Sequence, residues 1–145
     1  MLKQIRMNLE GILHISGKPG LFKVISKGKN TIIVESLIDG KRSPIGSQSQ
    51  ANMLEEIGIY TYNDTEPLTK IFESIAKKEN GKKTISHKSS TNDLTTYFAE
   101  ILPEYDKERV YNSDIKKIIQ WYNFMQMANL ITIKKEKRTP KKNQS

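Results

Sequence analysis

The chain of 145 residues contains no cysteine. A disulfide framework, a Cys-based zinc site and a dithiol redox site are therefore excluded. Long hydrophobic runs are also missing: the aliphatic run at residues 32–34 is far shorter than the ~20 residues that span a bilayer. Residues 1–6 carry two basic side chains with no apolar stretch behind them, unlike a secretory signal. We expect a soluble, cytoplasmic protein without membrane contact.

The residue patterns of common catalytic and metal sites are missing as well. A phosphate-binding loop needs fixed glycine spacing and a hydroxyl residue, but Gly11 and Gly17 are one residue too far apart and Pro19 occupies the hydroxyl position. The two histidines, His14 and His87, lie in unrelated segments, so they suggest neither a metal pair nor a nucleophile–base pair.

The acidic residues do not form a catalytic pair either. Glu55 and Glu56 are adjacent and would point to different sides of a helix. The cluster at residues 104–109 alternates acidic residues with Lys107 and Arg109, which is typical of a solvated turn. We predict a protein that is not an enzyme and has no metal, no cofactor and no small-molecule substrate.

The formal net charge of +8 is unevenly distributed. Residues 1–79 hold 11 basic and 9 acidic groups, and residues 93–133 hold 4 basic and 6 acidic groups, so these apolar-rich segments are together neutral. The excess lies in residues 80–92 and 134–145, which contain few apolar residues. We expect 80–92 to be a flexible basic linker and 134–145 a disordered basic tail. Such a tail either attracts phosphate without reading sequence or only improves solubility.

Residues 7–79 have the pattern of a small β-barrel domain with a C-terminal helix. Turns rich in Gly, Asn and Asp separate four predicted strands at residues 21–26, 31–37, 42–45 and 58–62. Because Pro44 lacks a backbone donor, its strand should be short or lie at an edge. Closely spaced strands with short turns favour a strongly bent sheet or barrel over a parallel sheet.

Helical elements are predicted at three places in this domain. The spacing of Leu9, Ile12 and Leu13 predicts a short helix over residues 8–14, and a helical turn is expected at 50–56. Residues 1–6 are an N-terminal extension in this interpretation, with Met7 as a second possible start. The third element is a helix with a capping Asp-Thr pair, a proline in its first turn and a core stripe: Asp64, Thr65, Pro67, Leu68, Ile71, Phe72 and Ile75.

Residues 93–133 form a predicted helical domain of two helices. The first is capped by Asn92 or Asp93 and stopped by Pro103, and the second is capped by Asn112 or Ser113 and extends to about residue 129. A segment this small rarely folds alone. We therefore expect its aromatic face, which we call the docking face, to pack on the barrel, on a second copy or on another protein. Its residues are Trp121, Tyr122 and Phe124.

Two surfaces have side chains suited to nucleic acid. On the barrel, basic and aromatic side chains suggest phosphate contact and base stacking, unless the aromatic residues are core and the lysines merely solvated; they are Lys18, Lys23, Lys41 and Arg42 with Phe22, Tyr60 and Tyr62. On the second helix, outward polar residues could instead imitate a groove-reading pair; they are Lys116, Lys117, Gln120 and Asn123. The long acidic connection before that helix argues against this alternative.

Several strings go beyond generic patterning. They are Ile-Ser-Gly-Lys-Pro-Gly-Leu-Phe-Lys at 15–23, Ile-Val-Glu-Ser-Leu at 33–37, Lys41-Arg42-x-Pro44, Ile-Tyr-Thr at 59–61, Leu-Pro-Glu-Tyr-Asp at 102–106, Arg-Val-Tyr-Asn-Ser-Asp-Ile-Lys-Lys-Ile at 109–118 and Trp-Tyr-Asn at 121–123. Together they resemble an uncharacterised bacterial family of the Bacteroidetes lineage, made of domains of unknown function, over about residues 7–125.

The resemblance implies an α+β fold in which a small Tudor-like barrel precedes a helical domain. Barrels of this kind elsewhere bind protein or RNA. The motif residues suggested for a surface site are Ser16, Lys18, Pro19, Lys41, Arg42, Tyr60, Ser113 and Asp114. Our leading hypothesis is a binding module for RNA or a ribonucleoprotein. The alternatives are a protein–protein adaptor or homodimer that uses the docking face, and a helix-turn-helix-like DNA-binding protein.

Overall fold

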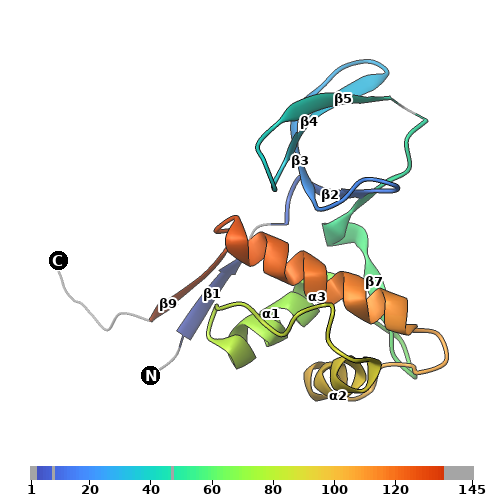
Figure 1. Ribbon diagram of the computed structural model, residues 1–145, viewed down its shortest axis with the longest axis vertical. Coiled ribbons are helices and arrows are strands. Elements are labelled where there is room, and N and C mark those ends of the chain that lie inside the picture. The colour runs from blue at the N-terminus through green and yellow to red at the C-terminus, as the bar shows by residue number, and fades with distance from the viewer. Residues whose placement is uncertain (1–2, 8, 47, 136–145) are drawn as a thin grey trace.

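The computed structural model describes residues 3–7, 9–46 and 48–135, and it has a mixed α+β fold. A bent antiparallel sheet occupies one end of the molecule and three helices occupy the other (Figure 1). Two further two-stranded sheets, β1–β9 and β7–β8, flank the helices. No helix in the described part of the chain is long and apolar enough to cross a membrane.

The main sheet has five strands in the order β5-β4-β3-β2-β6. Their bounds are β2 Ile12–Ile15, β3 Phe22–Lys27, β4 Thr31–Ser36, β5 Arg42–Gly46 and β6 Ala51–Met53. A register shift between Val24 and Ser26 bends the β3–β4 pair. The strands predicted at 21–26, 31–37 and 42–45 are confirmed, and Pro44 lies on an edge strand as expected.

The predicted closed barrel is not what the structure shows. Within the described residues the edge strands β5 and β6 do not pair with each other, so the sheet stays open. The physical reason lies in both edges: β6 has three residues, and Pro44 in β5 has no N–H to donate. The bent sheet still encloses a small apolar cluster of its own, formed by Leu13, Ile15, Phe22, Val34 and Ile45.

Strand β2 separates this sheet cluster from a larger core. Leu13 and Ile15 point into the sheet cluster, whereas Ile12 on the opposite face belongs to the core formed with the helices. The short helix predicted over residues 8–14 is therefore wrong, because Ile12–Ile15 is a strand. A strand buried on both faces carries consecutive apolar residues, which matched the spacing of a helical stripe.

After β6 the chain forms a 3-10 turn at Leu54–Glu56, strand β7 at Gly58–Tyr60, strand β8 at Thr65–Pro67 and helix α1 at Leu68–Glu79. The 3-10 turn confirms the end of the helical turn predicted at 50–56, although residues 51–53 are strand. The apolar stripe of α1 is buried as predicted. The predicted cap is wrong: Thr65 pairs with Tyr60 in the β7–β8 hairpin, and Pro67 directly precedes the helix.

Helices α2, Thr91–Ile101, and α3, Asn112–Met127, confirm the two predicted helices. The cap of α2 is Ser90, whose Oγ accepts the Asp93 N–H at 3.1 Å. At α3 the Asp114 carboxylate accepts the Tyr111 N–H at 2.9 Å. Apolar residues of α1, α2 and α3 join Leu9, Ile12, Leu21 and Leu54 in one core cluster, which joins the regions predicted as separate domains.

Residues 80–92, expected as a flexible linker, make specific contacts with α3. The Asn123 side chain accepts the Thr84 N–H at 2.9 Å and donates to the Ile85 carbonyl at 3.1 Å. The Tyr122 hydroxyl donates to the Lys82 carbonyl at 2.9 Å. Asn123 was expected to face outward. Its side-chain amide instead forms hydrogen bonds with the backbone of residues 84 and 85.

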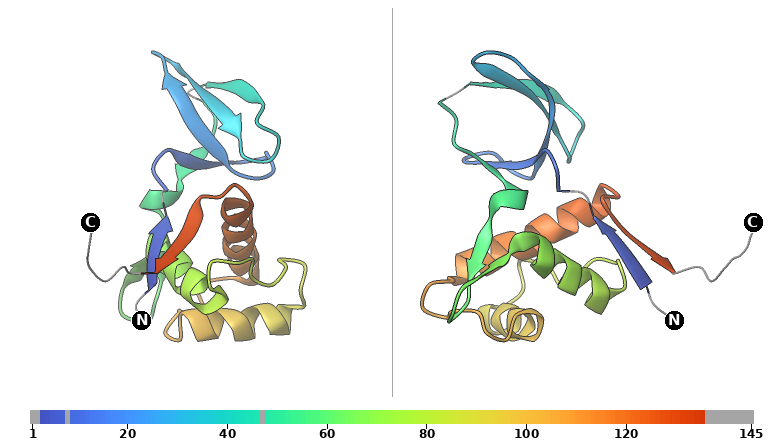
Figure 2. Two further views of the ribbon diagram at one scale, coloured as in Figure 1. Left: turned by 90° about the vertical axis from the view of Figure 1, so that its left-hand side faces the viewer. Right: turned by 180° about the vertical axis from the view of Figure 1, so that it is seen from behind.

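The two ends of the described chain pair with each other. Strand β1, Lys3–Met7, runs antiparallel to β9, Ile131–Lys135, so that Ile5 lies opposite Ile133 (Figure 2). Residues 3–6, predicted as an extension, and residues 134–135, predicted as part of the tail, are thus strand. The rest of the predicted disordered tail, residues 136–145, lies outside the described residues.

Candidate ligand-binding cavity

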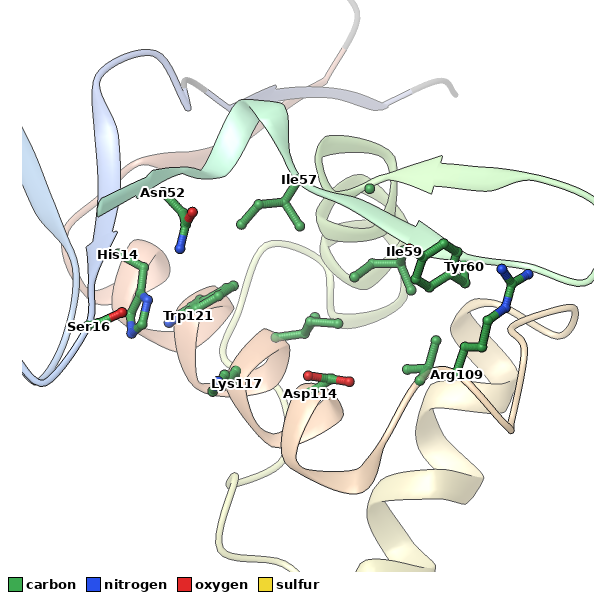
Figure 3. A pocket seen from close by; sticks show the side chains of 13 residues that line it. His14, Ser16, Asn52, Ile57, Ile59, Tyr60, Arg109, Asp114, Lys117 and Trp121 are labelled. Atoms are coloured by element: carbon green, nitrogen blue, oxygen red, sulfur yellow. The ribbon is translucent and has the colours of Figure 1, made fainter. Parts of the chain in front are cut away.

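A cavity of about 320 Å³ lies where the main sheet meets β7 and α3 (Figure 3). We call it the junction cavity. Its lining residues are His14, Ser16, Asn52, Ile57, Gly58, Ile59, Tyr60, Arg109, Val110, Asp114, Lys117, Ile118 and Trp121. Its volume lies at the lower end of the range typical of small-ligand sites. The structure brings together here five residues singled out from the sequence: Ser16, Tyr60, Asp114, Lys117 and Trp121.

One end of the cavity is an arginine stacked on a tyrosine. The Arg109 guanidinium carbon lies 4.2 Å from the centroid of the Tyr60 ring, within the range of a cation–π contact. Arg109 Nε donates to Asp106 Oδ2 at 2.8 Å, and Nη2 reaches the Thr61 carbonyl at 3.4 Å. Both Tyr60 and Arg109 remain exposed to solvent. The planar guanidinium is thus held in place and still accessible.

Asp106 is the residue that orients Arg109. It is buried, and its Oδ1 accepts the Glu108 N–H at 2.9 Å. The hydrogen bond from Arg109, followed by that from the Glu108 backbone, holds the pKa of the Asp106 carboxyl below its usual value. The Asp106 N–H in turn donates to the Tyr60 carbonyl at 2.9 Å. The same residue therefore connects the turn before α3 both to Arg109 and to β7.

Sequence reasoning missed this arrangement. Residues 104–109 were predicted to be a solvated turn, but Tyr105 and Asp106 are buried, and Thr61 forms a bridge with Tyr105. The available signal was an acid followed three residues later by an arginine, a spacing that suits a local ion pair. Nothing in the sequence indicated that Tyr60 would lie beneath that arginine.

The other end of the cavity comes from β2 and β6. His14 lies opposite Asn52 in the strand register, and both side chains face the cavity (Figure 3). The His14 ring lies 5.1 Å from the Trp121 ring, at an interplanar angle of 45°. Partial burial, and secondarily the positive charge of Lys117, lower the pKa of His14, which favours its neutral form. Neutral imidazole offers one hydrogen-bond donor and one acceptor.

Helix α3 contributes two charged groups of opposite sign. The Lys117 ammonium is exposed, whereas the Asp114 carboxylate is partly covered and occupied by its bond to the Tyr111 N–H. A carboxylate in the first turn of a helix is favoured by the helix dipole. Asp114 therefore has a structural partner, and Lys117 is the available cation on this side.

The predicted surface residues of the main sheet lie elsewhere. Lys23 and Arg42 flank Glu35 in the strand register, and the Arg42 guanidinium pairs with that carboxylate at 3.0 Å. Their charge is thus partly balanced on the sheet. Lys41 is exposed before β5. Phe22, predicted as a possible stacking residue, is buried in the sheet cluster.

The remaining predicted residues are exposed but do not line the cavity. They are Lys18, Pro19, Tyr62, Ser113 and Lys116. The docking face packs inside the molecule, one of the three placements considered from the sequence: Trp121 and Tyr122 are buried, and Phe124 is half-buried against the same core. Among the described residues, no group of three His, Asp or Glu side chains is placed to hold a metal ion.

Comparison with known proteins relates the chain to relatives of similar fold. Two family models match, each described as a domain of unknown function: DUF5606 over residues 9–54 and DUF6852 over residues 57–125. A solution NMR structure from Bacteroides vulgatus, a Northeast Structural Genomics Consortium target, is 45% identical with a TM-score of 0.70, over 84% of this chain and 88% of that one. The chain belongs to this Bacteroidetes family. No curated protein matches it.

The two family models correspond to the two sides of the junction cavity. The first covers β2 to β6 and contains His14, Ser16 and Asn52, and the second covers β7 to α3 and contains the Tyr60–Arg109 pair. Their boundary lies between residues 54 and 57, within the region predicted as one domain. The cavity thus lies between the two matched regions, and ligand sites are common at such junctions.

Proposed function

We propose that the protein is a non-enzymatic binding module for RNA, free or in a ribonucleoprotein, and that single-stranded RNA enters the junction cavity. The observation that carries this proposal is the accessible guanidinium of Arg109 stacked on Tyr60. Unpaired bases stack on aromatic rings and on guanidinium planes. Lys117 on the rim supplies a positive charge for a phosphate.

Contacts within the protein order the arginine of this site. Asp106 holds the Arg109 side chain in place through a hydrogen bond of 2.8 Å. An arginine that is already ordered loses less conformational entropy when it binds, so more of the contact free energy contributes to affinity. This ordering distinguishes Arg109 from the exposed lysines that were predicted as phosphate contacts.

The alternatives have weaker support. An adaptor that uses the docking face would need Trp121 and Tyr122 exposed, but both are buried in the protein's own core. A groove-reading helix would need a wide free face on α3, but Lys117 faces the junction cavity and Asn123 holds residues 84–85. By fold analogy, we also propose that the bent sheet is related to Tudor-like barrels. We further propose a cytoplasmic location.

The test is the binding of a fluorescent single-stranded RNA of about eight nucleotides to the full chain across a salt series. Tyr60→Ala and Arg109→Ala should each weaken binding about 5- to 150-fold, which corresponds to the ~1–3 kcal/mol of one stacked base. Lys117→Ala should reduce the slope of log affinity against log salt by about 0.7, as expected for one phosphate contact on a single strand.

Two controls separate the cavity from general positive charge. Arg42→Ala removes an exposed arginine on the far strand of the main sheet and should leave affinity nearly unchanged. Deletion of residues 136–145 removes basic tail residues but keeps β9, and it should lower the salt slope without removing the effect of Tyr60→Ala. The proposal is wrong if the full chain binds no RNA at low salt, or if only the tail deletion matters.

A further inference from the structure

The polar end of the junction cavity contains two solvent-exposed side chains, Ser16 and Asn52, whose hydrogen-bonding groups are available to a ligand. The Asn52 side chain faces the cavity (Figure 3), and among the described residues its amide has no hydrogen-bond partner. The Ser16 hydroxyl also has no partner in this part of the chain. His14 beside them lies against the Trp121 ring, and the charge of Lys117 acts on it.

Between the two ends isoleucines cover part of the cavity wall, with Asp114 and Lys117 beside them on α3. Ile57 and Ile59 line one side, and Ile118 from α3 lines the other. A phosphate or carboxylate would lose hydration against the isoleucines. A flat heteroaromatic ring fits this wall better, because its faces contact the isoleucines while its edge meets the polar groups.

We propose that the cavity takes one unpaired adenine of the RNA and that Asn52 is the residue that reads it. This inference rests on the proposed function. An asparagine amide offers one acceptor and two donors, and paired contact of its oxygen and nitrogen with the adenine N6 and N7 is a favoured arrangement. The groups beside Asn52, the Ser16 hydroxyl and the His14 imidazole, are uncharged or favour the uncharged form.

Two of the three charged side chains of the cavity are already paired within the protein, and the third, Lys117, acts on His14 at this end. Arg109 stacks on Tyr60 at the opposite end, and its Nε is occupied by Asp106. Asp114 accepts the Tyr111 N–H at the start of α3. Guanine is usually read by an arginine or a lysine, so a neutral amide at this end favours adenine. Lys117 on the rim then serves the phosphate next to the inserted base.

The experiment compares three RNAs of about eight nucleotides with the full chain: all uridine, the same strand with one central adenine, and the same strand with one central guanine. The adenine strand should bind about 5- to 150-fold more tightly than the other two, the range of one paired base contact. Asn52→Ala should remove this preference, so that the adenine strand binds no more tightly than the uridine strand does to the same variant. Asn30→Ala is the matched control, because Asn30 is an exposed asparagine in the β3–β4 turn.

The outcomes separate this inference from the proposed function. Equal binding of all three strands, or an adenine preference that survives in Asn52→Ala, overturns the adenine assignment while RNA binding stands. A preference for guanine also overturns it and points to Lys117 or Asp114 as the reading group. Failure of every strand to bind at low salt overturns both proposals. Asn52→Ser provides a second variant with a smaller change in shape, and it should also lose the preference.

Discussion

Arg109 lies above the ring of Tyr60, with 4.2 Å between the guanidinium carbon and the ring centroid. The two residues come from different elements, the turn before α3 and strand β7. Asp106 connects them, since its carboxylate accepts from Arg109 Nε and its N–H donates to the Tyr60 carbonyl. A single buried carboxylate thus holds both parts of the stacking platform, and the properties of the platform should depend on its charge.

Asp106→Asn should loosen Arg109 and lower the melting temperature at neutral pH. The pKa of Asp106 is depressed in the folded state, so its stabilising contribution is present above the ordinary Asp pKa of 3.8 and is lost as pH falls through the folded-state value. The loss of stability in the variant should therefore shrink below about pH 4. Thermal melts from pH 7 to pH 2 measure this.

The same variant separates positioning from folding. Nuclear magnetic resonance of the Arg109 Hε proton should show a narrow, protected signal in the parent protein and an exchange-broadened one in Asp106→Asn. Asp93→Asn is the control, because Asp93 is an exposed carboxylate in the first turn of α2. An unchanged Arg109 signal in Asp106→Asn would contradict the assigned role.

The single tryptophan should report the protonation of His14. Because burial and Lys117 lower the pKa of His14, Trp121 fluorescence should change on acidification with a midpoint below the usual histidine value of 6.5. Lys117→Ala should raise the midpoint. The stabilising contribution of neutral His14 is present above pH 6.5 and is lost as pH falls through the folded-state pKa.

The control for this titration is His87→Gln, which changes the other histidine and should leave the fluorescence transition in place. His14→Gln should remove the transition. A transition of equal midpoint and amplitude in His14→Gln would show that another group controls the tryptophan.

Asn123→Ala should destabilise the protein by about 1–3 kcal/mol, because it removes the partner of two backbone groups at once. Urea unfolding measures the loss, and hydrogen exchange should show faster exchange of the Thr84 amide. Lys116→Ala, on the exposed side of the same helix, should change stability by no more than about 0.5 kcal/mol. A variant as stable as the parent would mean that residues 84–85 are held by other contacts.

Two glycines in the β2–β3 turn should both lose stability on substitution by alanine, Gly20 slightly more than Gly17. Gly17 and Gly20 both have positive φ, 82° and 78°, so Gly→Ala should cost about 1–2 kcal/mol at each. At Gly20 the new methyl would also lie 2.5 Å from the Ile38 side chain, whereas nothing lies within 4 Å of it at Gly17. Because Ile38 is half-exposed and can turn away, the added cost at Gly20 should be small and should vanish in an Ile38→Ala background. Thermal or urea unfolding of the single and double variants tests this.

Most elements of the fold could be predicted because each has a local signal. The stripe Leu68, Ile71, Phe72 and Ile75 follows helical spacing, and Pro103 stops α2 two residues after its last helical position. Strand β2 was predicted wrongly because it is buried on both faces, so its apolar residues have no period of two. The β1–β9 pairing was not predicted because the two strands lie at opposite ends of the chain and neither is strongly apolar.

The residues of the candidate site also divide into those that the sequence indicated and those that it did not. Tyr60, Lys117 and Trp121 were singled out by residue type, whereas Asn52, His14 and Arg109 were either ignored or assigned no role in binding. The proposed role of each depends on residues far away in the sequence. Asn52 faces a cavity lined largely by β7 and α3, His14 lies against Trp121, and Arg109 lies over Tyr60. No periodicity or spacing records such a partner.

Residue types and short spacings alone predicted helices α1, α2 and α3, strands β3, β4 and β5 of the bent sheet, the lack of thiol chemistry and the family. The packing of whole elements established that the sheet stays open within the described residues, that Trp121 and Tyr122 are core, and that β2, β7 and α3 enclose a cavity. The reason is physical: burial and hydrogen bonding between distant segments depend on how whole elements pack, and a side chain's role changes with the neighbours that packing provides.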